Sequence, residues 1–102
     1  MANNTQQEVI EIIKKNKSFF KENFHVKKIA LFGSILKDDF KPDSDVDLYI
    51  EFEKPIGTRF IHLIDYLEKI LGRKVDVLTP GGLKTIRILE IKNSIQQSLK
   101  YV

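Results

Sequence analysis

Apolar residues recur along the chain with two periods, one typical of helices and one typical of strands. Some segments carry them at spacings of three or four, which places them on one helical face. Between these segments lie shorter runs that are continuously apolar or alternate with polar residues, as in strands. The predicted helices cover 5–24, 58–72 and 83–102, and the predicted strands cover 27–33, 45–53 and 73–80.

A further turn or two of helix is predicted to begin at Ser34, which gives the order α-β-α-β-α-β-α. This order favours a mixed sheet of three or more strands packed against helices, in an α/β or α+β fold. We find no internal repeat, linker or low-complexity segment, so we expect a single domain over 1–102. Thr5 and Glu8 form a capping box for the first helix, and Gly72 is a good C-terminal stop for the second long one.

The composition is that of an ordinary globular protein, with 42% hydrophobic and 30% charged residues and no cysteine. No apolar run approaches the roughly 20 residues that a membrane span needs, and the polar N-terminus does not resemble a signal peptide. We therefore expect a cytoplasmic protein that makes no use of a membrane.

The net charge of +3 is too small to indicate nucleic-acid binding, which we consider an unlikely function. Lysines cluster at 14–17 and at 27–28. The simplest interpretation is a solvated helix face and a solvated strand entry, and the alternative is a patch that contacts phosphates.

Two carboxylates, Asp45 and Asp47, stand in the otherwise apolar second strand. Residues at i and i+2 share a strand face, so their Cβ atoms should lie roughly 6–7 Å apart. Charges at that distance repel by about 2–3 kcal/mol at an effective dielectric constant near 20. Such a pair needs either a cation between the carboxylates or an exposed position at the strand end.

Asp76, in the third predicted strand, can join the same face if the two strands are neighbours. Three converging carboxylates would form an oxygen site for Mg²⁺ or Mn²⁺. Upstream, Gly33 permits close approach of the backbone to a ligand, and Ser34 offers a hydroxyl and N–H groups to a phosphate. Carboxylates that hold two metal ions are typical of phosphoryl and nucleotidyl transfer.

Each feature alone has a simpler interpretation, as a turn, a strand cap or a surface acid. A calcium loop beginning at Asp43 is excluded, because Leu48 occupies the position of its glycine and Lys54 that of its glutamate. The combination is more specific than its parts.

"LFGS", ten further residues, "DVD" at 45–47 and the later Asp76 resemble the signature of the minimal nucleotidyltransferases, a family of the DNA-polymerase-beta-like superfamily. The resemblance covers nearly the whole chain. It implies that Asp45, Asp47 and Asp76 hold the catalytic metal ions, and that Asp76 helps to activate the acceptor hydroxyl.

The resemblance also implies that Gly33 and Ser34, with Lys37, bind the phosphates of a nucleoside triphosphate, most often ATP. Small members of the family are similar to antitoxins that transfer AMP to a tyrosine of a HEPN-type toxin. A stable complex with such a toxin is therefore implied.

The chain departs from the family pattern "GSRARG", because Ile35 replaces one arginine, Lys37 the other and Asp38 the glycine. Lysine meets a phosphate only as a point charge, and isoleucine cannot meet one at all. Two functions follow as alternatives: an active adenylyl-transferring antitoxin, or a weak or inactive antitoxin that neutralises its toxin by binding alone. A small nucleic-acid-binding adaptor, resting on the lysines, is a third.

Overall fold

The computed structural model describes residues 6–37, 44–84 and 89–102. It contains helices, a short 3₁₀ helix and strands. In chain order they are α1 (Gln6–Phe24), β1 (Val26–Phe32), η1 (Gly33–Leu36), β2 (Val46–Phe52), α2 (Arg59–Leu71), β3 (Val75–Leu78), α3 (Pro80–Lys84), α4 (Leu89–Ser98) and β4 (Lys100–Tyr101).

The strands form one sheet in the order β3-β2-β1-β4. β1 pairs antiparallel with β2 and with β4, whereas β2 and β3 run parallel. The parallel pair is possible because α2 returns the chain to the starting end of the sheet, which a short turn cannot do. The predicted mixed sheet packed against helices is confirmed.

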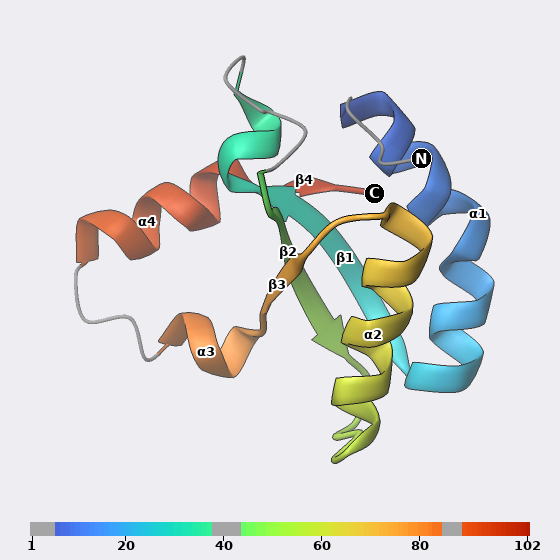
Figure 1. Cartoon of the computed structure of the whole chain (residues 1–102). Helices are drawn as coiled ribbons and strands as arrows, with labels where there is room; N and C mark the ends of the chain where they lie inside the picture. The colour runs from blue at the N-terminus through green and yellow to red at the C-terminus, as the bar shows by residue number, and fades with distance from the viewer. Residues whose placement is uncertain (1–5, 38–43, 85–88) are drawn as a thin grey trace.

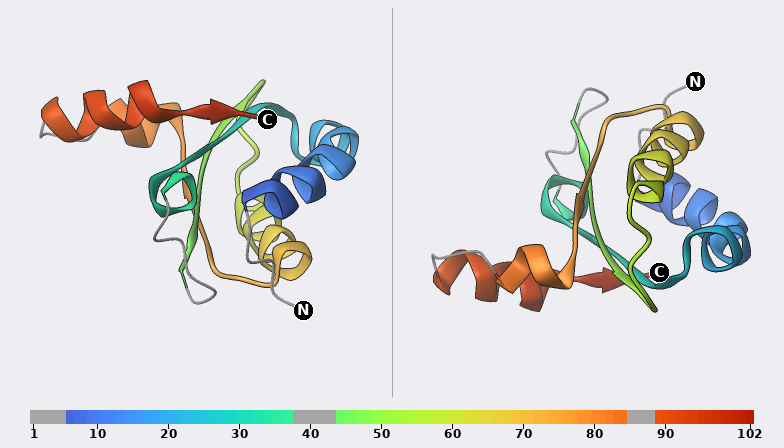
Figure 2. Two further views of the ribbon diagram at one scale, coloured as in Figure 1. Left: turned by 90° about the horizontal axis from the view of Figure 1, so that it is seen from above. Right: turned by 90° about the horizontal axis from the view of Figure 1, so that it is seen from below.

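The helices cover the two faces of this sheet unequally (Figures 1 and 2). α1 and α2 pack side by side on one face, where the main core forms, and α3 and α4 lie on the other side. A smaller cluster on that second face joins Ala30 and Tyr49 to Leu83 of α3, with Ile95 of α4 packed against it. No described helix is both long and apolar enough to cross a bilayer.

The ends of the long helices follow local sequence rules. Gly72 adopts a left-handed conformation, with φ of 67°, and its N–H donates to the carbonyl oxygen of Glu68 at 2.9 Å, which closes α2 as predicted. The capping box of α1 depends on Thr5, which lies outside the described residues.

The start of the helix predicted over 83–102 is wrong, and positions 85–88 of that prediction lie outside the described residues. Pro80, Gly81 and Gly82 begin α3 instead of closing a strand, because Thr79 provides a helix start: its hydroxyl accepts a hydrogen bond from Gly82 N–H at 3.2 Å. Pro80 occupies the first helical position, where no N–H is needed.

The end of that prediction is also wrong, because α4 ends at Ser98 and Lys100–Tyr101 form β4. Tyr101 pairs with Ala30 of β1, and Val102 N–H donates to the carbonyl oxygen of Ile29 at 2.9 Å. The edge of β1 offers unpaired backbone groups, and satisfying them outweighs the helical spacing of the last apolar residues.

Candidate functional site at the end of the sheet

The predicted site residues gather where β1 ends and β2 and β3 begin. β2 runs antiparallel to β1 and parallel to β3, so these three ends meet at one side of the sheet. Asp47 pairs with Phe32 of β1 on one side and with Asp76 of β3 on the other. The expected meeting of Asp47 and Asp76 on one face is therefore observed.

Asp47 and Asp76 interact directly, and the interaction changes the proton affinity of Asp47. Burial, followed in size by the negative charges of Asp76 and Asp45, raises the pKa of the Asp47 carboxyl from 3.8 to about 6. A hydrogen bond with the Asp76 carboxyl acts in the same direction. Each of these influences favours the protonated form of the Asp47 carboxyl.

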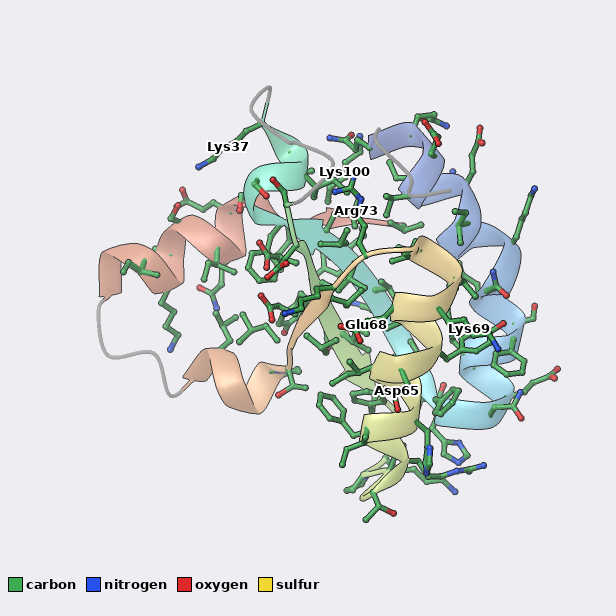
Figure 3. The ribbon with its side chains drawn as sticks, in the orientation of Figure 1. Lys37, Asp65, Glu68, Lys69, Arg73 and Lys100 are labelled. Atoms are coloured by element: carbon green, nitrogen blue, oxygen red, sulfur yellow. The ribbon has the colours of Figure 1, made fainter. Side chains whose placement is uncertain are left out.

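Asp45 precedes β2 and is exposed, so it is not part of the strand as predicted. Its position is set by its neighbours. The buried guanidinium of Arg73 donates to the carbonyl oxygen of Ser44 at 2.9 Å, and Val46 N–H donates to that of Lys74 at 3.0 Å. The segment that carries Asp45 is therefore held from the α2–β3 connection, where Figure 3 shows Arg73.

Gly33 follows β1 in a left-handed conformation, with φ of 79°, which glycine adopts without strain. A Cβ at this position would overlap the carboxylate of Asp47. Position 33 therefore needs a glycine because the Asp47 carboxylate leaves no room for a side chain. The position of Gly33 in the sequence did not indicate this reason. Ser34 is half-buried, and its carbonyl oxygen accepts from Lys37 N–H at 2.9 Å, which closes η1.

A hollow of about 440 Å³ lies beside Gly33, between η1 and α4. The exposed Lys37, which points away from η1 in Figure 3, is part of its wall. Among the described residues, those that line it are Phe32, Gly33, Leu36, Lys37, Ser94, Ile95 and Ser98, and Ser34 and the three aspartates do not belong to this set.

Ser94 and Ser98 bring hydroxyl groups from α4 to this hollow, and sequence reasoning missed both. Both serines lie beside the apolar stripe of the predicted helix, where polar residues are expected. Their positions in the sequence therefore do not indicate a binding site. Only the packing of Ile95 against the second face of the sheet brings them near Gly33.

The burial of Ile35 explains why the chain departs from the family pattern "GSRARG" at this position. Its side chain is 2% exposed and belongs to the main core, so η1 turns this position inward. Gln6 of α1 fixes that arrangement, since its side-chain amide donates to the Ile35 carbonyl oxygen at 3.0 Å. An arginine at this position would require η1 to turn differently, which leaves Lys37 as the cation that this segment can offer to a phosphate.

The carboxylates fit a divalent cation by their chemistry. Hard cations prefer carboxylate oxygens, and a cation would relieve the repulsion that raises the pKa of Asp47. Within the described ranges, however, no group of three or more Asp, Glu or His side chains is arranged to hold a metal ion as it stands. Asp47 and Asp76 form a pair, and Asp45 acts on it electrostatically without completing a ligand cluster.

Comparison with known proteins places this geometry in a family. Residues 9–102 match the family model described as "Nucleotidyltransferase domain". The chain therefore belongs to the nucleotidyltransferase domain family, and it is a nucleotidyltransferase. The resemblance of the chain to the nucleotidyltransferases is thereby confirmed.

Two relatives match over most of their length. A protein of Methanocaldococcus jannaschii with the provisional name protein adenylyltransferase MJ1379 is 42% identical over 101 residues, which cover 96% of this chain and 98% of the relative. Protein adenylyltransferase MntA of Thermococcus cleftensis is 40% identical over 86 residues, or 83% of this chain and 87% of the relative.

Solved structures share the fold at low identity. A structure provisionally described as a minimal nucleotidyltransferase superposes with a TM-score of 0.74 at 18% identity and covers 97% of both chains. The crystal structure of a toxin–antitoxin with AMP-PNP superposes with a TM-score of 0.59 at 18% identity, over 94% of this chain and 70% of that chain.

Proposed function

We propose that this protein transfers AMP from ATP to a hydroxyl group, a tyrosine, of a partner toxin of the HEPN type, and so acts as its antitoxin in the cytoplasm. One observation supports this most directly. Asp47 and Asp76 stand side by side on neighbouring strands, against the Gly33 backbone at the end of β1. This is the arrangement that nucleotidyl transfer needs, because metal-binding carboxylates and a phosphate site must adjoin.

In this proposal Asp45, Asp47 and Asp76 hold Mg²⁺, as two ions, with Mn²⁺ as an alternative. The bound metal would neutralise the charge that develops on the phosphates. Asp76, exposed at the start of β3, also accepts the proton of the acceptor hydroxyl.

Gly33 and Ser34, with Lys37 at the hollow beside them, bind the β- and γ-phosphates of ATP. The acceptor oxygen then forms a bond to the α-phosphorus while the bond to the β-phosphate oxygen breaks, and pyrophosphate leaves. The protein contributes mainly position and charge to such a reaction.

The named relatives support the choice of acceptor. Two proteins that are 40–42% identical carry the name protein adenylyltransferase. The toxin–antitoxin crystal structure was obtained with AMP-PNP, an analogue of ATP, which supports a nucleoside triphosphate as donor and a toxin as partner.

The test is incubation with ATP labelled at the α-phosphate, Mg²⁺ and the candidate toxin, followed by detection of label on the toxin. We expect label on a tyrosine, and its loss in the Asp45→Asn/Asp47→Asn variant. Asp65→Asn is the matched control, because Asp65 is an exposed carboxylate on α2. Transfer that survives the double substitution would contradict the proposal.

A second function, neutralisation by binding alone, has an observation in its favour. The three aspartates form no ready metal cluster within the described ranges, and the position of the family's first arginine is buried as Ile35. In cells, Asp45→Asn/Asp47→Asn should then suppress toxicity as well as the wild type does. Loss of suppression by a variant that still binds the toxin would exclude this second function.

A further inference from the structure

A groove lined by lysines runs between the second half of α1 and the start of β1, and continues toward β4. It consists of two hollows, of about 300 and 190 Å³, which share Lys17, Lys27, Lys28 and Ile29 in their walls. The larger adds Lys21 and Ser18, and the smaller adds Tyr101. We call this surface, defined by Lys17, Lys21, Lys27, Lys28 and Tyr101, the lysine groove.

The backbone explains why the lysines gather there. Lys17 and Lys21 are four residues apart on α1 and therefore share a helix face. Lys27 and Lys28 are both exposed although they are adjacent in β1, because the pairing register with β2 shifts between Val26 and Lys28. The irregularity turns two neighbouring strand residues toward solvent, where a regular strand would expose one.

The charge of the groove is only partly balanced. Among the described residues that line the two hollows, none has an acidic side chain. Glu51 lies opposite Lys28 in the register of β2 and offsets part of its charge. The small net charge of the chain therefore conceals a concentrated positive surface, which the composition alone did not indicate.

Tyr101 adds an aromatic surface to this charge. Its side chain is 53% exposed on the edge strand β4, and the Lys28 ammonium lies 5.7 Å from its ring centroid. An exposed ring of this size beside lysines is the combination with which proteins hold single strands, stacking a base on the ring and neutralising the phosphates. An acidic peptide would use the lysines but would gain nothing specific from the ring.

The groove is separate from the carboxylate site. It lies at the start of β1, and Gly33 follows the other end of that strand. Four residues of extended chain lie between Lys28 and Gly33, so these two residues are about 15–20 Å apart. A ligand in the groove would therefore leave the carboxylate site open.

We propose that the lysine groove binds single-stranded nucleic acid, with phosphates against Lys17, Lys21, Lys27 and Lys28 and a base stacked on Tyr101. This binding is independent of AMP transfer, and it differs from the expectation from composition that nucleic acid is an unlikely partner. A lysine ammonium is a point charge and lacks the two parallel donors of a guanidinium. The groove therefore recognises the phosphate backbone of the nucleic acid and is tolerant of its base sequence.

The test is fluorescence anisotropy of labelled single-stranded oligo(U) and oligo(dT) with the full chain, over a range of salt concentrations. Four lysine–phosphate contacts predict a slope of log K against log salt of about −3, so a fourfold rise in salt should weaken binding about 50-fold. The variant Lys17→Gln/Lys27→Gln/Lys28→Gln should reduce the slope to about −1.

Matched variants separate the groove from net charge. Lys15→Gln/Lys54→Gln/Lys69→Gln removes three exposed lysines elsewhere and should bind almost as the wild type does. Tyr101→Leu should weaken binding at least fivefold, whereas Tyr101→Phe keeps the ring and should not. Circular dichroism of each variant confirms that it is folded.

Two results would overturn the proposal. The first is equal binding by the two triple-lysine variants, since the affinity would then depend on net charge alone. The second is a polyglutamate peptide that binds as tightly as the oligonucleotides and is indifferent to Tyr101→Leu, which would assign the groove to an acidic protein segment.

Discussion

The backbone of Gly33 lies directly against the carboxylate of Asp47, so closely that any side chain at position 33 would overlap an oxygen of Asp47. The two residues are 14 positions apart in the chain, and the pairing of Phe32 with Asp47 brings them together. The glycine turn after β1 and the first carboxylate of β2 are therefore one structural unit. A substitution at either residue should therefore change the position of the other.

Gly33→Ala should displace Asp47 and reduce AMP transfer by at least tenfold. It should also cost about 1–3 kcal/mol of the free energy of unfolding, because alanine is strained at positive φ and its Cβ meets the carboxylate. Urea denaturation and labelled transfer to the partner measure the two effects.

The matched control for Gly33→Ala is Gly57→Ala. Gly57 also has a positive φ, of 58°, but a Cβ there meets nothing within 4 Å. Gly57→Ala should lower the free energy of unfolding through backbone strain, but it should not reduce AMP transfer. If both variants lose transfer equally, contact with Asp47 is not the cause.

The raised pKa of Asp47 makes the stability of the protein depend on pH in an unusual direction. The folded state holds the Asp47 proton more tightly than the unfolded chain does, with a pKa of about 6 instead of 3.8. The stabilisation from this proton is complete below about pH 4 and is lost as pH rises through about 6. Asp47→Asn should therefore stabilise the protein above pH 6, by about 1 kcal/mol once solvent screening is allowed for.

Urea denaturation at about pH 4 and about pH 8 tests this, with Asp65→Asn as the control. The increase in the free energy of unfolding caused by Asp47→Asn should be present at about pH 8 and absent at about pH 4. An equal gain at both pH values would mean that the Asp47 proton is not the cause. The same variant should lose transfer, so stability and activity would change in opposite directions.

Divalent cations and protons should compete at the same carboxylates. Millimolar Mg²⁺ should raise the melting temperature at about pH 8, where Asp47 is ionised, and much less at about pH 5, where it holds a proton. Chelation with EDTA should reverse the shift. A shift that persists in Asp45→Asn/Asp47→Asn would place the cation elsewhere on the protein.

The meeting of Asp47 and Asp76 was predictable because it follows from regular geometry. Each aspartate stands in a run of strand residues, and strand residues alternate between faces, so two adjacent strands with a shared hydrophobic pattern bring them together. The helices α1 and α2 were predictable for the same reason, since their apolar stripes match the core that they cover.

The features that were missed depend on distant contacts. β4 has two residues, too few for any periodicity, and it exists because the edge of β1 is open to it. In the sequence, Arg73 is one of several charged residues between a helix and a strand. Only the folded chain shows that its guanidinium donates a hydrogen bond to the carbonyl oxygen of Ser44. Ser94 and Ser98 reach the hollow beside Gly33 only because α4 packs on the second face of the sheet.

Arg73 should act as a positioning residue for Asp45. Its side chain is 7% exposed and donates to the carbonyl oxygen of Ser44, so Arg73→Met should leave that segment less ordered. Loss of a charged hydrogen bond predicts a cost of about 1.5–3 kcal/mol in the free energy of unfolding. Weaker Mg²⁺ binding, seen as a smaller rise in melting temperature, should accompany it.

Arg59→Met is the control for this prediction, because Arg59 is exposed and its guanidinium lies 6.0 Å from the Phe24 ring centroid, within the helical layer. It should leave the effect of Mg²⁺ unchanged. If Arg73→Met lowers stability but keeps the full response to Mg²⁺, Arg73 supports the fold and does not position Asp45.

Lys37 is the cation of the "GSILK" segment that can meet a phosphate, because Ile35 is buried and Lys37 is exposed at the hollow beside Gly33. Lys37→Gln should raise the KM for ATP about three- to tenfold and change kcat little, since its charge meets ground state and transition state alike. Lys54→Gln, at another exposed lysine, should change neither. Lys37→Arg should lower the KM, because a guanidinium binds phosphate through two donors. An unchanged KM in both Lys37 variants would mean that the triphosphate lies outside this hollow.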